Sequence, residues 1–198
     1  MENNIFEDLA NRYDTRERIE LAKVIVEVVR SELQNSKSKS LIDYGSGTGL
    51  ISLEISDLVD SILLVDSTKQ MLEVAKTKIS QKGITNSNVL YSDFTQETPE
   101  LKADIVLLSL VLLHIPDTDK ILQELFRILN DGGKLIIIDF DKNDRINHPK
   151  VHNGFLHNEL KKRLSEVGFK SIEMKTFYQG TRIFMNQDAS IFISTCIK

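Results

Sequence analysis

The sequence is poor in the residues that indicate a secreted, metal-binding or membrane protein. It has a single cysteine, Cys196, so an internal disulfide is impossible and no cysteine cluster indicates a structural metal. The longest nearly apolar run, 105–115, has 11 residues and is interrupted by Ser109 and His114, which makes it too short to span a bilayer. The N-terminal residues are polar and acidic and do not resemble a signal peptide. We therefore expect a cytoplasmic protein with no metal and no membrane partner.

Positive charge is not in excess either, which bears on the partners that the protein can have. The net charge is −4, whereas a nucleic-acid substrate favours a basic surface, so we expect no nucleic-acid partner. A composition of 41% hydrophobic and 27% charged residues is ordinary for a globular protein. A chain of 198 residues suits one well-filled core, and we expect a single domain over 1–198.

The most informative stretch, 40–50, combines an apolar strand start with an acid, Asp43, and three alternating glycines. Gly45, Gly47 and Gly49 allow a backbone turn with positive φ that approaches a ligand closely. The apolar residues that follow predict a helix near 49–57, whose free N–H groups would face ligand oxygens. Three glycines alone would equally suit a tight turn that packs a helix on a strand.

A second acid supports a nucleoside site. The apolar strand 62–65 ends in Asp66, 21 residues after Gly45, where a carboxylate can accept hydrogen bonds from both ribose hydroxyls. As a strand-end carboxylate in an open cleft, Asp66 is expected to contribute little to the stability of the ligand-free protein. A dinucleotide fingerprint would have a small residue at position 50, where this chain has Leu50.

Strand and helix patterns alternate along the chain. We expect strands at 41–44, 61–65, 88–92, 104–109 and 134–140, and helices at 5–33 (with a polar break at 11–14), 49–57, 68–82, 117–130 and 159–167. Two further strands, 171–178 and 189–197, are expected to form a hairpin joined by a loop that contains Gly180. The pattern predicts an α/β, Rossmann-like fold, mostly parallel, with helices on both faces and a C-terminal antiparallel hairpin.

In these motifs the sequence resembles the class I S-adenosylmethionine-dependent methyltransferases, in the small-molecule branch related to the ubiquinone/menaquinone enzymes. The resemblance covers about residues 5–198 and depends on four segments, namely 43–49, Val65-Asp66, 91–94 and 109–117. It implies a seven-stranded sheet, S-adenosyl-L-methionine as cofactor and S-adenosyl-L-homocysteine as product. It also implies that residues 1–39 form a helical lid or cover and that 40–198 form the core with its acceptor-side loops.

The resemblance further implies a set of cofactor-binding residues: Tyr13, Asp43, Gly45, Ser46, Gly47, Gly49, Asp66, Ser67, Asp93, Phe94 and Ser109. In the family pattern, Asp43 reaches the methionine ammonium, Asp93 the adenine amine, and Phe94 lies beside the base. His114 would face the methyl group as a catalytic base, although methyl transfer does not always need one. Asp43 as a turn cap, Asp93 as a turn residue, Phe94 as a core residue, Tyr13 as a surface tyrosine and His114 as a packed histidine remain alternatives.

The acceptor is the least specified part of the function. We expect a small molecule and a monomer or homodimer; the alternatives are a protein or RNA methyltransferase, or a non-catalytic S-adenosylmethionine-binding module. The Asn-Pro-Pro type of motif used on amide or adenine amines is absent, and Ser109-Leu110-Val111-Leu112 stands in its place. The polar segment 142–152 is expected to be a loop near the acceptor site. His148, His152 and His157 would suit a metal only on a helix, which Pro149 opposes.

Overall fold

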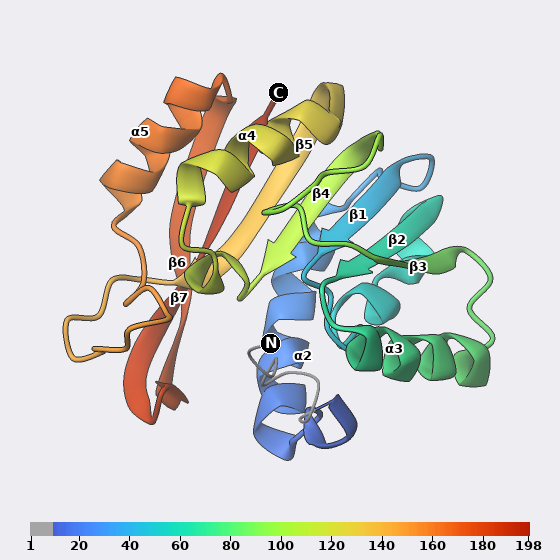
Figure 1. The fold of residues 1–198 in the computed structure, drawn as a ribbon, viewed down its shortest axis with the longest axis horizontal. Helices are drawn as coiled ribbons and strands as arrows, with labels where there is room; N and C mark the ends of the chain where they lie inside the picture. Colours follow the sequence, from blue (N-terminus) through green and yellow to red (C-terminus); the bar gives the residue numbers. More distant parts are fainter. Residues whose placement is uncertain (1–9) are drawn as a thin grey trace. The chain divides into compact units, whose positions relative to one another are not determined.

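The structure, a computed structural model, describes residues 10–198, so the expected helical residues 5–9 lie outside the described part. Seven strands occur in the sheet order β3-β2-β1-β4-β5-β7-β6 (Figure 1), which confirms the expected mostly parallel α/β fold with an antiparallel end. The chain divides into two compact units, the first ending at Asp93 and the second spanning Phe94–Lys198. The single domain with a lid over 1–39 stays a prediction.

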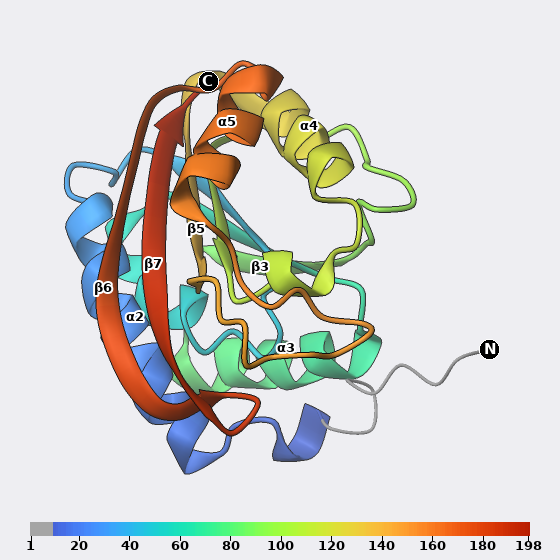
Figure 2. The ribbon, with the colours of Figure 1, turned by 90° about the vertical axis from the view of Figure 1, so that its left-hand side faces the viewer.

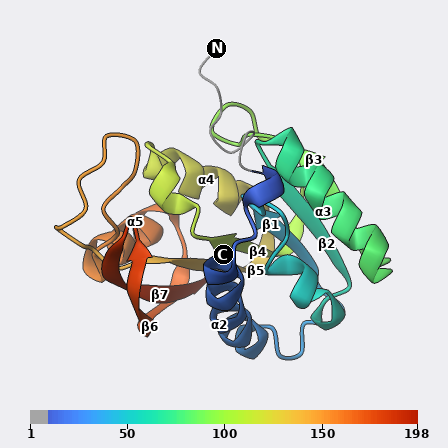
Figure 3. The same cartoon turned by 90° about the horizontal axis from the view of Figure 1, so that it is seen from below.

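The first unit contains three parallel strands, β1 (Ser40–Tyr44), β2 (Ser61–Asp66) and β3 (Ser87–Tyr91). Tyr44 lies opposite Val65, and Asp66 lies opposite Tyr91, so the three carboxyl ends reach the same edge. Helix α3 (Lys69–Lys82) contacts β2 and β3 (Figure 3) through an apolar face that includes Met71, Leu72 and Ala75. It ends, as expected, at Gly83 in the left-handed conformation.

The N-terminal part of this unit has a short 3₁₀ helix, η1 (Ala10–Arg12), and a long helix, α2 (Arg16–Glu32). Thr15 caps α2, because its hydroxyl accepts the amide of Arg18. The buried side chains of α2 recur at helical spacing, at Ala22, Ile25, Val26 and Val29. Residues 13–15 separate η1 from α2, so the polar break expected at 11–14 is present at 13–14, whereas 11–12 lie in η1.

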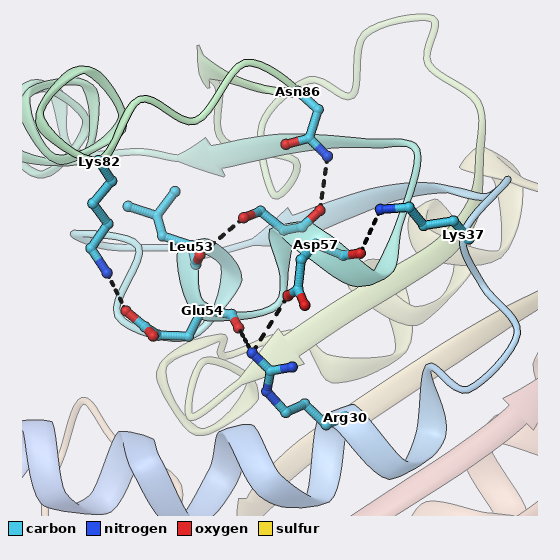
Figure 4. Close-up of polar contacts among 8 residues, drawn as sticks. Arg30, Lys37, Leu53, Glu54, Asp57, Lys82 and Asn86 are labelled. Carbon is cyan, nitrogen blue, oxygen red and sulfur yellow. Dashed lines mark hydrogen bonds and ion pairs between the residues drawn. The ribbon is translucent and has the colours of Figure 1, made fainter.

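The helix expected at 49–57 is wrong, because the structure has two 3₁₀ turns there, η2 (Ser52–Glu54) and η3 (Ser56–Leu58). The apolar side chains that suggested a helix, Leu53 and Ile55, are buried. Side chains from other elements take the carbonyls that a continuing helix would use (Figure 4): Arg30 binds Glu54 O, Lys37 binds Asp57 O, and Asn86 binds Ser56 O. Tertiary hydrogen bonds thus replace local helical ones.

In the second unit, β4 (Ala103–Ser109) and β5 (Leu129–Phe140) are parallel, whereas β7 (Gln187–Ile197) runs antiparallel to both β5 and β6 (Lys170–Phe184). Helices α4 (Thr118–Ile128) and α5 (His157–Val167) contact each other, and they contact β5 and β6 respectively (Figure 2). The Asp117 side chain caps α4 by accepting the amide of Lys120 at 2.9 Å.

The terminal hairpin is present, but its turn is not where the sequence suggested. Gly180 lies within β6, and the turn falls at Met185 and Asn186, with φ of 48° and 61° between the paired residues Phe184 and Gln187. Two positive φ values in a two-residue loop match the twist of a hairpin, so the reversal does not need a glycine. Residues 130–133, expected to end a helix, instead lie in β5 at a register shift against β4.

Candidate functional site

The glycine loop is built on the end of β2. The amides of Gly45 and Ser46 donate to Val65 O at 2.8 and 3.0 Å, and the amide of Gly47 donates to Asp66 Oδ2 at 2.8 Å. The expectation of a helix start with free amides is therefore wrong for these residues. The protein itself occupies the donors, and this fixes the shape of the loop before any ligand binds.

Asp66 holds two backbone segments in the ligand-free protein, contrary to expectation. Its side chain is buried, with Oδ2 on the amide of Gly47 and Oδ1 on the amide of Thr68, both at 2.8 Å. An ionised carboxylate offers about four lone-pair sites, so it can accept further hydrogen bonds from a ligand. Ser67 lies between these contacts and is exposed. Asp66 thus joins the glycine loop to the start of α3.

Asp43 is a second buried carboxyl in the same unit. It is 4% exposed, and Ser52 Oγ donates to its Oδ2 at 2.6 Å. Burial raises the pKa of Asp43 to about 7; the Ser52 hydrogen bond opposes this shift and the charge of Asp66 adds to it. Near neutral pH the carboxyl is therefore close to half ionised, and a cationic ligand beside it would favour the charged form.

The segment that precedes α2 is tied to the glycine loop by Asp14. Asp14 Oδ1 accepts the hydroxyl of Thr48 at 2.6 Å, and Oδ2 lies 2.5 Å from Lys78 Nζ. Lys78 Nζ also donates to Thr48 O at 2.9 Å, so α3, the loop and the N-terminal segment share one polar cluster. A Cβ built on Gly47 would lie 3.8 Å from Tyr13 Cε1, which places the predicted tyrosine at the loop.

Gly47 and Gly49 of the loop differ in the space available for a side chain. Gly49 has φ of +75°, and a Cβ there would lie 2.9 Å from Leu53 Cγ and 3.0 Å from Leu64 Cδ2, so packing requires the glycine. Gly47, with φ of +54°, has only the ordinary Tyr13 contact. Beside it, Ser46 Oγ is buried and has no hydrogen-bond partner among residues 10–198. An open position next to an unsatisfied hydroxyl fits a polar ligand on this loop.

The predicted adenine residues follow β3. The amide of Ser92 donates to Asp66 O at 3.1 Å, which brings the chain before Asp93 to the end of β2. Asp93 is partly buried and is the last residue of the first unit. Phe94 begins the second unit and is 1% exposed, so it is a core residue of the ligand-free protein.

In the second unit, the chain leaves β4 through a strained turn. Ser109 Oγ, at the strand end, is buried without a hydrogen-bond partner in the described part of the chain. Leu110 follows with φ of +56°, an unfavourable conformation for a leucine, and the 3₁₀ helix η4 (Leu112–His114) comes next. His114 is exposed at its edge; desolvation by the surrounding protein, followed by the charge of His148, lowers its pKa, so the imidazole is neutral at pH 7.

Two residues that fix this turn, Asp139 and His152, were not assigned a role from the sequence. Asp139 is fully buried, and its carboxylate accepts the amides of Leu113 at 3.1 Å and Phe140 at 2.8 Å. Burial raises the pKa of Asp139 to about 7, against the opposing effect of the amide hydrogen bonds. His152 donates its amide to Leu113 O and its Nε2–H to Ile115 O, both at 2.8 Å. The available signal for Asp139 was an acid that ends an apolar strand, as at Asp43 and Asp66.

The histidines of segment 148–157 have separate partners. His148 Nδ1 accepts the amide of Lys150, whereas His157 Nε2 donates to Asp141 Oδ1 at 2.7 Å. Asp141 Oδ2 also accepts the hydroxyl of Thr176. Over residues 10–198, no three His, Cys, Asp or Glu side chains are grouped so that they could hold a metal ion. Within the same residues, none of the helices has the length and apolar character needed to cross a membrane.

The sequence is similar to known methyltransferases. The family described as "Methyltransferase domain" matches residues 35–186. The ubiquinone/menaquinone biosynthesis C-methyltransferase UbiE of Pasteurella multocida is 29% identical over 194 residues, which cover 93% of this chain and 72% of that protein.

Solved structures share the fold at lower identity. A SAM-dependent methyltransferase from Aquifex aeolicus is 20% identical, with a TM-score of 0.72 over 96% of this chain and 97% of that one. Phosphoethanolamine N-methyltransferase 2 of Haemonchus contortus, solved with S-adenosyl-L-methionine, is 15% identical, with a TM-score of 0.71 over 98% of this chain and 60% of that one. The chain belongs to the methyltransferase-domain family and is a class I S-adenosylmethionine-dependent methyltransferase related to UbiE.

Proposed function

We propose that this enzyme methylates a small molecule, and that the acceptor is an aromatic ring that carries hydroxyl groups, of the hydroquinone type. The observation that carries the proposal is the turn after β4. It presents a neutral imidazole, His114, after the partly exposed aliphatic residues Leu110 and Val111, while Leu112 and Leu113 are buried in the core. An apolar segment with one base suits an apolar ring with an acidic hydroxyl, whereas a nucleic acid would need positive charge. The Pasteurella relative is named as a ubiquinone/menaquinone biosynthesis C-methyltransferase, and this name supports the same class.

The cofactor residues predicted from the sequence divide into groups with distinct proposed tasks. Asp66 and Ser67 would hold the ribose hydroxyls, and Asp93 and Phe94 the adenine. The remaining residues would hold the methionine portion: Tyr13, Asp43, Gly45, Ser46, Gly47, Gly49 and Ser109. The unsatisfied hydroxyls of Ser46 and Ser109 support this assignment, because buried polar atoms normally have a partner.

When bound, S-adenosylmethionine supplies a methyl group already activated on a sulfonium, so the protein mainly has to orient the acceptor and exclude water. The neutral His114 would accept the proton of an acceptor hydroxyl, and the resulting phenolate would place electron density on the ring carbon. The new carbon–carbon bond would take its electron pair from the ring, the electrons of the methyl–sulfur bond would remain on sulfur, and the ring carbon would then lose its proton to solvent or base. A carbon that is acidic enough would not require His114.

Label transfer tests the proposal. The purified protein is given S-adenosylmethionine with an isotopically labelled methyl group, together with an extract that is afterwards separated into small molecules, RNA and protein. We expect label in the small-molecule fraction and on a naphthohydroquinone with an unsubstituted ring carbon that is supplied separately. Label confined to RNA or protein would refute the small-molecule acceptor, and label on amines or thiols alone would refute the hydroquinone class. The cytoplasmic location and the oligomeric state stay predictions.

A further inference from the structure

The turn that carries His114 is held from two sides, by the buried side chain of Asp139 and by the backbone amide and partly buried side chain of His152. On the amide side, Asp139 Oδ2 accepts the N–H of Leu113. On the carbonyl side, His152 binds Leu113 O and Ile115 O. The backbone on both sides of His114 is therefore fixed, while the His114 side chain itself reaches the surface.

The turn is also strained, which explains why it needs these contacts. Leu110 enters it in the left-handed region at φ of +56°, which is unfavourable for a residue with a side chain. Such a conformation persists only where the surrounding structure enforces it, and it occurs preferentially at functional sites. The amide of Leu110 bonds Ile138 O at 2.8 Å, one residue before Asp139, so the end of β5 supports the turn at two successive positions.

Asp139 has the position and the hydrogen bonds needed to hold the turn in place. It is fully buried, and its carboxylate bonds the backbone of its own strand end and of the turn at once, joining Phe140 to Leu113. A fully buried carboxylate is costly unless its hydrogen bonds compensate. A residue kept only for stability could be apolar at this position, as its neighbours Ile136, Ile137 and Ile138 are.

We propose that Asp139 is a positioning residue for methyl transfer: through the amide of Leu113 it holds the turn that presents His114 to the acceptor. The inference rests on the proposed role of His114. Asp139 itself touches neither acceptor nor cofactor, and it acts through the backbone. Its loss should therefore disturb the chemistry and the surroundings of His114 while cofactor affinity is preserved.

The main test compares Asp139→Asn with the control Asp104→Asn, which changes a partly buried acid at the opposite end of β4 whose Oδ1 accepts from Asn130. Asparagine offers one acceptor oxygen and turns an amide group toward the second backbone N–H, so the turn loses at least one contact. We expect hydrogen exchange at the Leu113 amide to become faster by a factor of about ten or more. The ring pKa of His114, measured by NMR, should rise toward its ordinary value of about 6.5. Asp104→Asn should change neither. Unchanged exchange and an unchanged His114 titration in Asp139→Asn would overturn the proposal.

Kinetics provides a second readout on the same variants. With the hydroquinone acceptor, kcat of Asp139→Asn should fall about 10- to 100-fold, as for a misplacement of roughly 1 Å, while adenosylhomocysteine affinity stays within about twofold. Equal losses of kcat and cofactor affinity would indicate general damage and overturn the positioning role. If the parent transfers no methyl group to hydroquinones while the NMR differences are present, the proposed acceptor is wrong. The positioning of His114 by Asp139 is then still supported.

A second variant covers the case in which Asp139→Asn does not fold. His152→Ala removes the side-chain hydrogen bond to Ile115 O at the carbonyl side of the same turn, keeps the backbone amide bond to Leu113 O, and leaves the buried carboxylate intact. It should shift the His114 titration in the same direction. An unchanged titration would mean that the turn does not control His114, which would overturn the inference.

Discussion

Replacement of Asp66 by alanine should weaken both the ligand-free fold and the cofactor complex, because the structure gives this carboxylate two tasks. In the free protein it accepts the amides of Gly47 and Thr68, each at 2.8 Å, from a nearly buried position. Hydrogen bonds to a charged group contribute roughly 1.5–3 kcal/mol each, and water that enters the vacated space would recover part of this. We therefore expect a loss of about 2–4 kcal/mol in the free energy of unfolding.

Thermal unfolding without ligand measures the first task. A domain of this size loses roughly 2–4 °C in Tm per kcal/mol, so Asp66→Ala should unfold about 5–15 °C below the parent. Asp60→Ala, which removes an exposed acid just before β2, is the matched control and should change Tm little. If Asp66→Ala unfolds with the parent, the two amide contacts contribute nothing and the account of the loop is wrong.

Calorimetry with two ligands separates the second task from the first. Adenosylhomocysteine and its 2′,3′-dideoxy analogue should differ about 10- to 100-fold in affinity for the parent, since each ribose hydroxyl would form a charge-assisted hydrogen bond with Asp66. Asp66→Ala should bind both ligands weakly and almost equally, with the common loss due to the loosened glycine loop. A variant that still discriminates between the two ligands as the parent does would refute the assignment of the ribose to Asp66.

Three further predictions concern the same unit. Burial raises the pKa of Asp43 to about 7, so the native state retains a proton that the unfolded chain has lost between pH of about 4 and 7. The contribution of Asp43 to stability therefore falls as pH rises through this window, by up to about 4 kcal/mol. Asp43→Asn should reduce the slope of the Tm profile without removing it, because burial raises the pKa of Asp139 into the same window, and a profile parallel to that of the parent would contradict this. Lys78→Met removes the ion pair with Asp14, in the segment that carries the predicted lid, so the rate of cofactor dissociation measured by stopped flow should rise about 5- to 30-fold. The control Lys76→Met removes an exposed ion pair on the same helix and should leave this rate unchanged. Gly49→Ala should lower the unfolding midpoint more than Gly47→Ala because only the former meets packed side chains, and equal midpoints would refute that distinction.

Local patterns were sufficient to predict the order of elements and the positions of several acids. Alternating apolar runs indicated the parallel strands, and the helices expected to end at 82 and 167 do so, followed by Gly83 and Gly168 in the left-handed conformation. An acid that ends an apolar strand marked Asp43 and Asp66, and the structure brings Asp66 to the glycine loop. These features follow from propensity, periodicity and turn chemistry, which act over a few neighbouring residues.

The roles of those residues depended on contacts between distant parts of the chain. The pattern at 49–57 indicated a helix, yet Arg30, Lys37 and Asn86 bind its carbonyls and leave two 3₁₀ turns. No local rule could show that Asp66 already holds the Gly47 amide, because the two residues are 19 positions apart. For the same reason the sequence assigned no role to Asp139, which holds an amide 26 positions earlier in the chain. The sequence by itself determined which side chains are available at the strand ends; only the tertiary structure decided which backbone groups they bind, because burial and hydrogen-bond partners are set by packing between remote segments.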